Sequence, residues 1–309
     1  MIRPSLPLLS LCIAFLLASS CADGDGGWVD AYPDYCNRTH LCTKSFKTWR
    51  SDLKASKRTT WNSKNACDMI LSKGINTITF FGDSYMRHMY LAVLLTLSNN
   101  YRNAGLSKPN KKCEYANQFD EKECRLILKL SSNVCSSQLK LIYNGFYPES
   151  NICVPSQLSF WSVGNHPVDL NYTSLEGINN STLYSDKIQR TELCKALVRK
   201  QTTTNSNVKS ADIHTQCSLF WVSTHARFKG HRLEAKELIK AYNEGMRAFF
   251  ADPAHCGIVK YIDVFNMTSS LLRDMYEDAK LPTHDGAHWS IEVNLIRMQI
   301  LLDNIQSQL

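Results

Sequence analysis

The sequence lacks several patterns that identify common classes of protein. No pair of cysteines has the CxxC spacing of a zinc site, and no block of lysine and arginine with interleaved aromatic residues marks a nucleic-acid-binding surface. Beyond the N-terminus, no apolar run reaches the roughly 20 residues that a membrane-spanning helix needs. Internal repeats and low-complexity linkers are also missing. We therefore expect no bound metal, no nucleic-acid partner and no stable membrane span in the mature chain.

The length and composition are those of a globular protein. The chain of 309 residues is long enough for one α/β domain with a core of ordinary size. Hydrophobic residues make up 44% of it and charged residues 20%, which excludes a disordered chain. The formal net charge of +7 would suit an acidic glycan or a membrane surface, but such a mild surplus usually supports only solubility.

The N-terminus has the pattern of a secretory signal peptide. Arg3 precedes an apolar segment at 6–17, and small residues follow it. We expect residues 1–21 to be removed, with a boundary defined to about two residues. The mature chain is then expected to be secreted or to stay in the lumen of the secretory pathway. A short uncleaved signal anchor is the alternative interpretation.

Cysteine usage agrees with an oxidising compartment. The chain has twelve cysteines, of which Cys12 lies inside the expected signal peptide. Cleavage after Ala22 would leave ten, an even number suited to five disulfides, whereas cleavage after Ser20 would leave eleven. One sequence does not determine the pairing. If the host is eukaryotic, sequons for N-linked glycosylation occur at Asn37, Asn171, Asn179, Asn180 and Asn266.

The chain divides into an irregular first part and a regular second part. Residues 22–70 lack periodicity but are rich in cysteine and tryptophan, which predicts a disulfide-tied N-terminal cap segment. Residues 71–309 alternate between apolar strand-like runs and helical ones, which predicts an α/β domain with a mainly parallel sheet covered on both faces. Strands are expected at 77–81, 138–143, 157–163, 217–223 and 258–265, and helices at 85–98, 232–250 and 290–306.

The segment FFGDSYMRH places Ser84 where a strand meets a helix. A serine hydroxyl attacks an acyl carbon only if a base takes its proton, and that base is usually a histidine oriented by a carboxylate. In the segment HDGAHW, Asp285 and His288 are three residues apart on a turn into the last helix, so their side chains share a face. The pattern predicts Ser84 as nucleophile, His288 as base and Asp285 as the residue that orients it.

Simpler structural roles remain open for the same residues. Ser84 could be the N-cap of its helix, Asp285 could cap the last helix, and His288 could pack against Trp289. The Gly-Asp-Ser turn also differs from the Gly-x-Ser-x-Gly elbow of α/β-hydrolases.

Three groups are candidates to bind an oxyanion. The backbone N–H of Ser84 would lie at the positive end of a helix. Gly145 follows the second expected strand, and a glycine lets its N–H approach a substrate closely. Asn165 follows the third expected strand and has a side-chain amide to donate. The alternative for Gly145 is an ordinary Asn-Gly turn.

In this order, the serine of GDS, a glycine, an asparagine and Asp-x-x-His resemble the SGNH (GDSL-like) hydrolase superfamily. The likeness is closer to its PC-esterase branch, which contains the trichome-birefringence-like polysaccharide O-acetyltransferases of plants and the sialate O-acetyltransferase-type proteins. Arg87 completes Gly-Asp-Ser-x-x-Arg, Trp289 follows His288, and a Cys- and Trp-rich segment precedes GDS. The likeness runs from about residue 21 to 306 and is specific at its two ends. It would retain Cys21, against an even cysteine count.

The resemblance implies a three-layer sandwich with a mainly parallel central sheet, plus the disulfide-rich N-terminal cap. It implies that Ser84 carries a transient acyl group, that His288 acts as base and then as acid, and that Asp285 orients His288. The oxyanion would be held by the N–H groups of Ser84 and Gly145 and by the amide of Asn165. Arg87 would support the site or bind an anionic group, with a surface salt bridge as the alternative.

The implied activity concerns O-acetyl esters, most simply those of a glycan or another O-acetylated small molecule. With water as acceptor the protein would be an O-acetylesterase, and with a sugar hydroxyl it would be an O-acetyltransferase. No cofactor is expected, although a transferase needs an acetyl donor. A catalytically silent glycan-binding or protein-interaction protein with the same fold is the alternative.

Overall fold

The computed structural model describes residues 28–30, 47–49, 61–145, 156–161, 218–224, 233–251, 259–269, 288–289 and 291–309. The chain divides into two compact units, Met1–Arg58 and Thr59–Leu309. In the first unit, β1 (Trp28–Asp30) and β2 (Lys47–Trp49) form an antiparallel pair. The expected end of the cap segment at residue 70 lies inside α3 (Ser63–Ser72), a helix of the second unit. The expected signal peptide lies outside the described residues.

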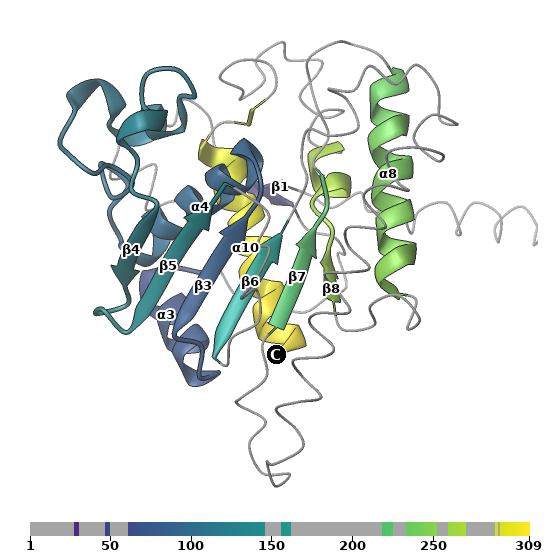
Figure 1. Ribbon diagram of the computed structural model, residues 1–309, viewed down its shortest axis with the longest axis horizontal. Helices are drawn as coiled ribbons and strands as arrows, with labels where there is room; N and C mark the ends of the chain where they lie inside the picture. Colours follow the sequence, from purple (N-terminus) through teal and green to yellow (C-terminus); the bar gives the residue numbers. More distant parts are fainter. Residues whose placement is uncertain are drawn as a thin grey trace, which may run out of the picture. The chain divides into compact units, whose positions relative to one another are not determined.

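A six-stranded sheet forms the centre of the second unit, in the order β4-β5-β3-β6-β7-β8 (Figure 1). The strands from β5 to β8 pair in parallel, and β4 pairs antiparallel with β5 at the edge. The predicted α/β class is therefore confirmed. The sequence did not predict β4, because its short polar run SSNV has no strand-like apolar pattern. The strands are β3 (Thr77–Phe81), β4 (Ser131–Val134), β5 (Leu139–Asn144), β6 (Gln157–Trp161), β7 (Ser218–Val222) and β8 (Val259–Ile262).

Alternating side chains of the strands show which helices cover which face. On one face, Phe80, Phe160 and Phe220 lie in a row, with ring centroids 5.2 and 5.4 Å apart. Phe80 also contacts Tyr90 of α4 (Ser84–Leu97), which packs against α10 (Ile291–Gln308). Trp221 points to the opposite face because it follows Phe220 in β7, and it contacts α8 (Leu233–Ala251). Helices therefore pack on both faces.

The end of β3 lies at a topological switch point, where successive parallel strands are added on opposite sides of β3. The next parallel strand along the chain, β5, lies on one side of β3, and the following one, β6, lies on the other. Ligands of open α/β sheets bind beyond the carboxyl ends of the strands at such a switch point. β3 leads into α4 through Gly82 and Asp83, so Ser84 begins its helix at this position.

Two disulfides are formed among the described cysteines, as an oxidising compartment would allow. Cys67–Cys135 joins α3 to the turn after β4, and Cys113–Cys124 closes a loop that contains the short 3-10 helix Tyr115–Phe119. The other cysteines, Cys21 included, lie outside the described residues. Among the helices that the structure describes, none combines the length and the hydropathy needed to cross a bilayer. The short helices are η1 (Lys111–Cys113), η2 (Tyr115–Phe119) and η3 (Arg125–Ile127).

Candidate active site

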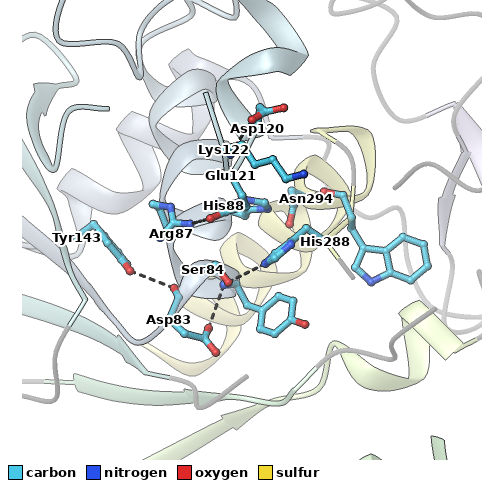
Figure 2. A network of polar contacts seen from close by, with 12 residues as sticks. Asp83, Ser84, Arg87, His88, Asp120, Glu121, Lys122, Tyr143, His288 and Asn294 are labelled. Atoms are coloured by element: carbon cyan, nitrogen blue, oxygen red, sulfur yellow. Dashed lines mark hydrogen bonds and ion pairs between the residues drawn. The ribbon is translucent and has the colours of Figure 1, made fainter. Parts of the chain in front are cut away.

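The Gly-Asp-Ser turn is held by β5, the neighbour of β3. Gly82 has a φ of 140°, a backbone conformation that residues other than glycine rarely adopt. Its N–H donates to the carbonyl of Asn144 at 3.3 Å. The hydroxyl of Tyr143 donates to the carbonyl of Gly82 at 2.9 Å. It also lies 3.2 Å from the carbonyl of Asp83, the contact drawn in Figure 2. Hydrogen bonds from β5 therefore hold the backbone of Gly82 and Asp83 in place just before the helix begins.

Asp83, and not Ser84, is the N-cap of α4. The carboxylate of Asp83 accepts the backbone N–H of Tyr85 at 3.0 Å. The expectation that Ser84 could serve as the cap is therefore wrong, because the residue before it fills that role. Ser84 is the first residue of the helix, where the N–H has no helical carbonyl partner and the helix end is positive.

Ser84 and His288 are brought together from opposite ends of the unit. The Oγ of Ser84 lies 2.7 Å from the Nε2 of His288, across a sequence separation of 204 residues (Figure 2). In the tautomer with the proton on Nδ1, the serine hydroxyl donates to Nε2. The His288 ring is flanked by the rings of Tyr85 and His88, each with centroids 5.1 Å away. Ser84 and His288 are both partly exposed.

A buried pair on α10 anchors the main chain next to His288. The side-chain amide of Asn294 donates to the carbonyl of Trp289 at 2.8 Å, and Nη1 of Arg297 donates to Oδ1 of Asn294 at 2.8 Å. Burial lowers the pKa of Arg297 to about 10, so its guanidinium stays charged at neutral pH. Trp289 itself is buried, so the residue that follows His288 packs in the core.

Arg87 forms a buried ion pair within the site. Its guanidinium pairs with the carboxylate of Glu121, and its side chain is only 5% exposed. The alternative of a surface salt bridge is therefore wrong. Because the carboxylate already occupies the guanidinium, these contacts favour support of the site over capture of an anionic group. The guanidinium also lies 5.9 Å from the ring centroid of Tyr143.

Glu121 also binds His88, and the two groups differ in charge. The Nε2–H of His88 donates to Oε1 of Glu121 at 2.6 Å. Burial lowers the pKa of His88 to about 4, against the opposing influence of Glu121, so the ring is neutral at pH 7. Burial would raise the pKa of Glu121, but its contacts with His88 and Arg87 outweigh that effect and hold the pKa below its usual range.

Gly145 lies at the same edge of the sheet as the Gly-Asp-Ser turn. It follows Asn144, the partner of Phe81 in the pairing of β5 with β3. A Cβ atom at Gly145 would lie 3.4 Å from the Tyr143 hydroxyl, an ordinary contact, so the described surroundings do not require a glycine there. The role of Gly145 as an oxyanion donor stays a prediction.

Several predicted residues lie outside the described part of the chain. They include Asp285, Asn165 and the sequons at Asn37, Asn171, Asn179 and Asn180. The remaining sequon residue, Asn266, is exposed, and its Nδ2 donates to Asp263 at 2.8 Å.

The sequence did not single out three residues near Ser84 and His288, namely Tyr143, His88 and Glu121. His88 had a usable signal, because a residue four positions after Ser84 lies on the same helix face. Glu121 had none, since no periodicity links it to α4.

The described residues contain no cluster of three or more His, Cys, Asp or Glu side chains that could hold a metal ion. No protein-family model matches the chain, and comparison with curated protein sequences and with solved structures gives no match.

Proposed function

We propose that the protein is a serine acyl-enzyme that acts on O-acetyl esters, most simply those of a glycan. The observation that carries this proposal is the 2.7 Å contact between Ser84 Oγ and His288 Nε2 at the carboxyl end of β3. Two residues so far apart in sequence meet at the position where α/β sheets bind ligands. A serine bonded to a histidine nitrogen is the pairing that nucleophilic acyl transfer needs.

The reaction would proceed in two steps. Ser84 Oγ attacks the acetyl carbonyl carbon while its proton passes to His288 Nε2, and the protonated His288 then gives that proton to the departing alcohol oxygen. Water or a sugar hydroxyl next loses a proton to His288 Nε2 and attacks the carbonyl carbon of the acetyl-serine. The bond from that carbon to Ser84 Oγ breaks, acetate or the sugar acetate leaves, and Oγ takes the proton back from His288. In this proposal Asp285 orients His288, and the oxyanion is held by the N–H groups of Ser84 and Gly145 with the amide of Asn165.

The proposed setting follows from the same resemblance. We propose an SGNH-like three-layer sandwich with a disulfide-rich N-terminal cap and a location in the secretory pathway or outside the cell. Helices on both faces of the sheet support the sandwich, and the two disulfides support an oxidising compartment. No cofactor enters the proposed mechanism.

The central test is trapping of the acetyl group on Ser84. We expect the secreted protein to release acetate from an aryl acetate, and Ser84→Ala and His288→Ala to lower kcat by about 10³-fold or more. A quenched reaction analysed by mass spectrometry should show acetyl-serine at position 84. Ser72→Ala, which removes an exposed hydroxyl on α3, is the matched control and should leave the rate unchanged.

The outcome also separates the classes of function. Equal rates in the unaltered chain and in Ser84→Ala would indicate a catalytically silent binding protein instead of an enzyme. If acetyl-serine forms, addition of a glycan acceptor distinguishes the two reactions, because a transferase makes a sugar ester whereas an esterase releases only acetate.

A further inference from the structure

Glu121 reaches the helix of the candidate nucleophile from a separate part of the chain. It lies between η2 and η3, inside the segment closed by the Cys113–Cys124 disulfide. Its side chain is 18% exposed, and its two oxygens contact consecutive residues of α4. One oxygen pairs with Arg87, and the other accepts the Nε2–H of His88 at 2.6 Å (Figure 2). Glu121 thus joins an inserted segment to α4.

These contacts fall on the helix face that carries the nucleophile. Arg87 and His88 follow it by three and four residues, the spacings that place side chains on one face. The ring of His88 lies against that of His288, with centroids 5.1 Å apart and planes inclined by 50°. On another side it meets the ring of Phe119, from the same segment as Glu121, at 5.2 Å. A single ring therefore separates Glu121 from His288.

The charges in this cluster balance only while Glu121 is ionised. The Arg87 side chain is buried and positively charged, and a buried charge that loses its partner is strongly destabilising. His88 adds no charge at pH 7, because burial lowers its pKa to about 4. Among the described residues, the titratable rings in contact with His288 are those of Tyr85 and His88. Arg87 and Glu121 adjoin His88, while Asp83 and Tyr143 lie at the start of α4 and Arg297 lies on α10.

We propose that Glu121 is a positioning residue for the Ser84–His288 pair, because its carboxylate neutralises Arg87 and holds the His88 ring against His288. This inference rests on the proposed acyl-transfer function. When His288 accepts the proton of Ser84 it becomes positively charged, and an uncompensated guanidinium nearby would oppose that charge. Glu121 touches neither reacting residue, so it acts through its two partners.

Glu121→Gln removes the charge and keeps both the shape and an acceptor for His88. We expect kcat for an aryl acetate to fall about tenfold or more, with KM nearly unchanged, because the effect arises as charge develops on His288. The acid limb of kcat/KM should move to lower pH by about one unit. Glu123→Gln, at an exposed carboxylate of the same segment, is the matched control and should keep the unaltered values.

Two double variants separate positioning from loss of folding. Glu121→Gln with Arg87→Met removes both charges, so the acid limb should return and most of kcat should be recovered. Glu121→Leu with Arg87→Met is equally neutral but lacks an acceptor for His88, and we expect its kcat to be about tenfold lower than that of the first double variant. Thermal unfolding of each protein shows that the compared chains are folded.

The results distinguish the inference from the proposed function. An unchanged kcat and pH profile in Glu121→Gln would overturn the positioning role in an active enzyme, and so would equal rates in the two double variants. If Glu121→Gln does not fold, the comparison of the double variants decides. Absence of any Ser84-dependent acetate release in the unaltered chain would overturn the proposed function and, with it, the role of Glu121.

Discussion

At the scale of single residues, the Gly-Asp-Ser turn assigns a different task to each of its positions. Gly82 adopts a φ of 140°, Asp83 caps α4 through its carboxylate, and Ser84 presents its hydroxyl to His288. Tyr143 secures the turn from β5 by donating to two of its carbonyls. The position of the nucleophile therefore depends on residues that do not themselves react.

Gly82→Ala should reveal that dependence. An alanine at a φ of 140° would be strained by about 1–3 kcal/mol, so we expect a lower free energy of unfolding and a displaced Ser84. Denaturant titration measures the first effect, and the rate of acetate release measures the second. Gly145→Ala is the matched control for the unfolding measurement alone, because its Cβ would meet only an ordinary contact, whereas its N–H is a proposed oxyanion donor. Equal losses of stability in the two variants would contradict this explanation.

The residues that sequence could predict were those with a local signal. Ser84 follows an apolar strand, and His288 lies in a short motif at the start of a helix, so each could be singled out by its neighbours. Glu121 had no such signal, since its contacts with α4 arise only when a separate segment folds onto that helix. Arg87 could be predicted as a candidate, but its burial could not.

At the scale of elements, one of the two disulfides closes a loop that contributes to the candidate site, and the other joins elements that do not. Cys113–Cys124 closes the segment that carries Glu121, with a sequence separation of 11. Cys67–Cys135 joins α3 to the turn after β4, with a separation of 68. A disulfide that closes a longer loop removes more chain entropy from the unfolded state, so Cys67–Cys135 should contribute more to stability than Cys113–Cys124.

We therefore expect the disulfide whose removal costs more stability to be the one whose removal costs less activity. Replacement of Cys67 and Cys135 by serine should cost about 4 kcal/mol, and replacement of Cys113 and Cys124 about 3 kcal/mol. Removal of Cys113–Cys124 should nevertheless lower the rate of acetate release more, because it frees the segment that holds Glu121. Denaturant unfolding and acetate release measure the two effects. A greater loss of activity on removal of Cys67–Cys135 would argue against a link between the segment and the site.

At the scale of the whole molecule, the buried His88 links global stability to pH. Its pKa is about 4 in the folded chain, against 6.5 for an unperturbed histidine. Between these values the unfolded state binds more protons than the folded state, so stability rises with pH. The contribution of His88 is complete above pH 6.5 and is lost as the pH falls towards 4. The depressed pKa of Glu121 acts in the same direction at lower pH.

His88→Gln should reduce this pH dependence while keeping a donor for Glu121. Unfolding free energies measured by denaturant between pH 4 and 6.5 should fall less steeply in the variant, by up to about 1.4 kcal/mol per pH unit for one proton. The other histidines cancel in the comparison because both chains retain them. Identical slopes in the two proteins would show that His88 titrates normally in the folded state.

The α/β class and the location of a serine at the carboxyl end of a strand followed from the sequence by itself, because apolar runs and turn residues act through short-range rules. Only the tertiary structure brought Ser84 Oγ within 2.7 Å of His288 Nε2, buried Arg87 and supplied Glu121 as its counter-charge. The antiparallel edge strand β4 and the order of the sheet were also decided there. The physical reason is that these features depend on contacts between distant segments, and no local pattern specifies which segments will meet.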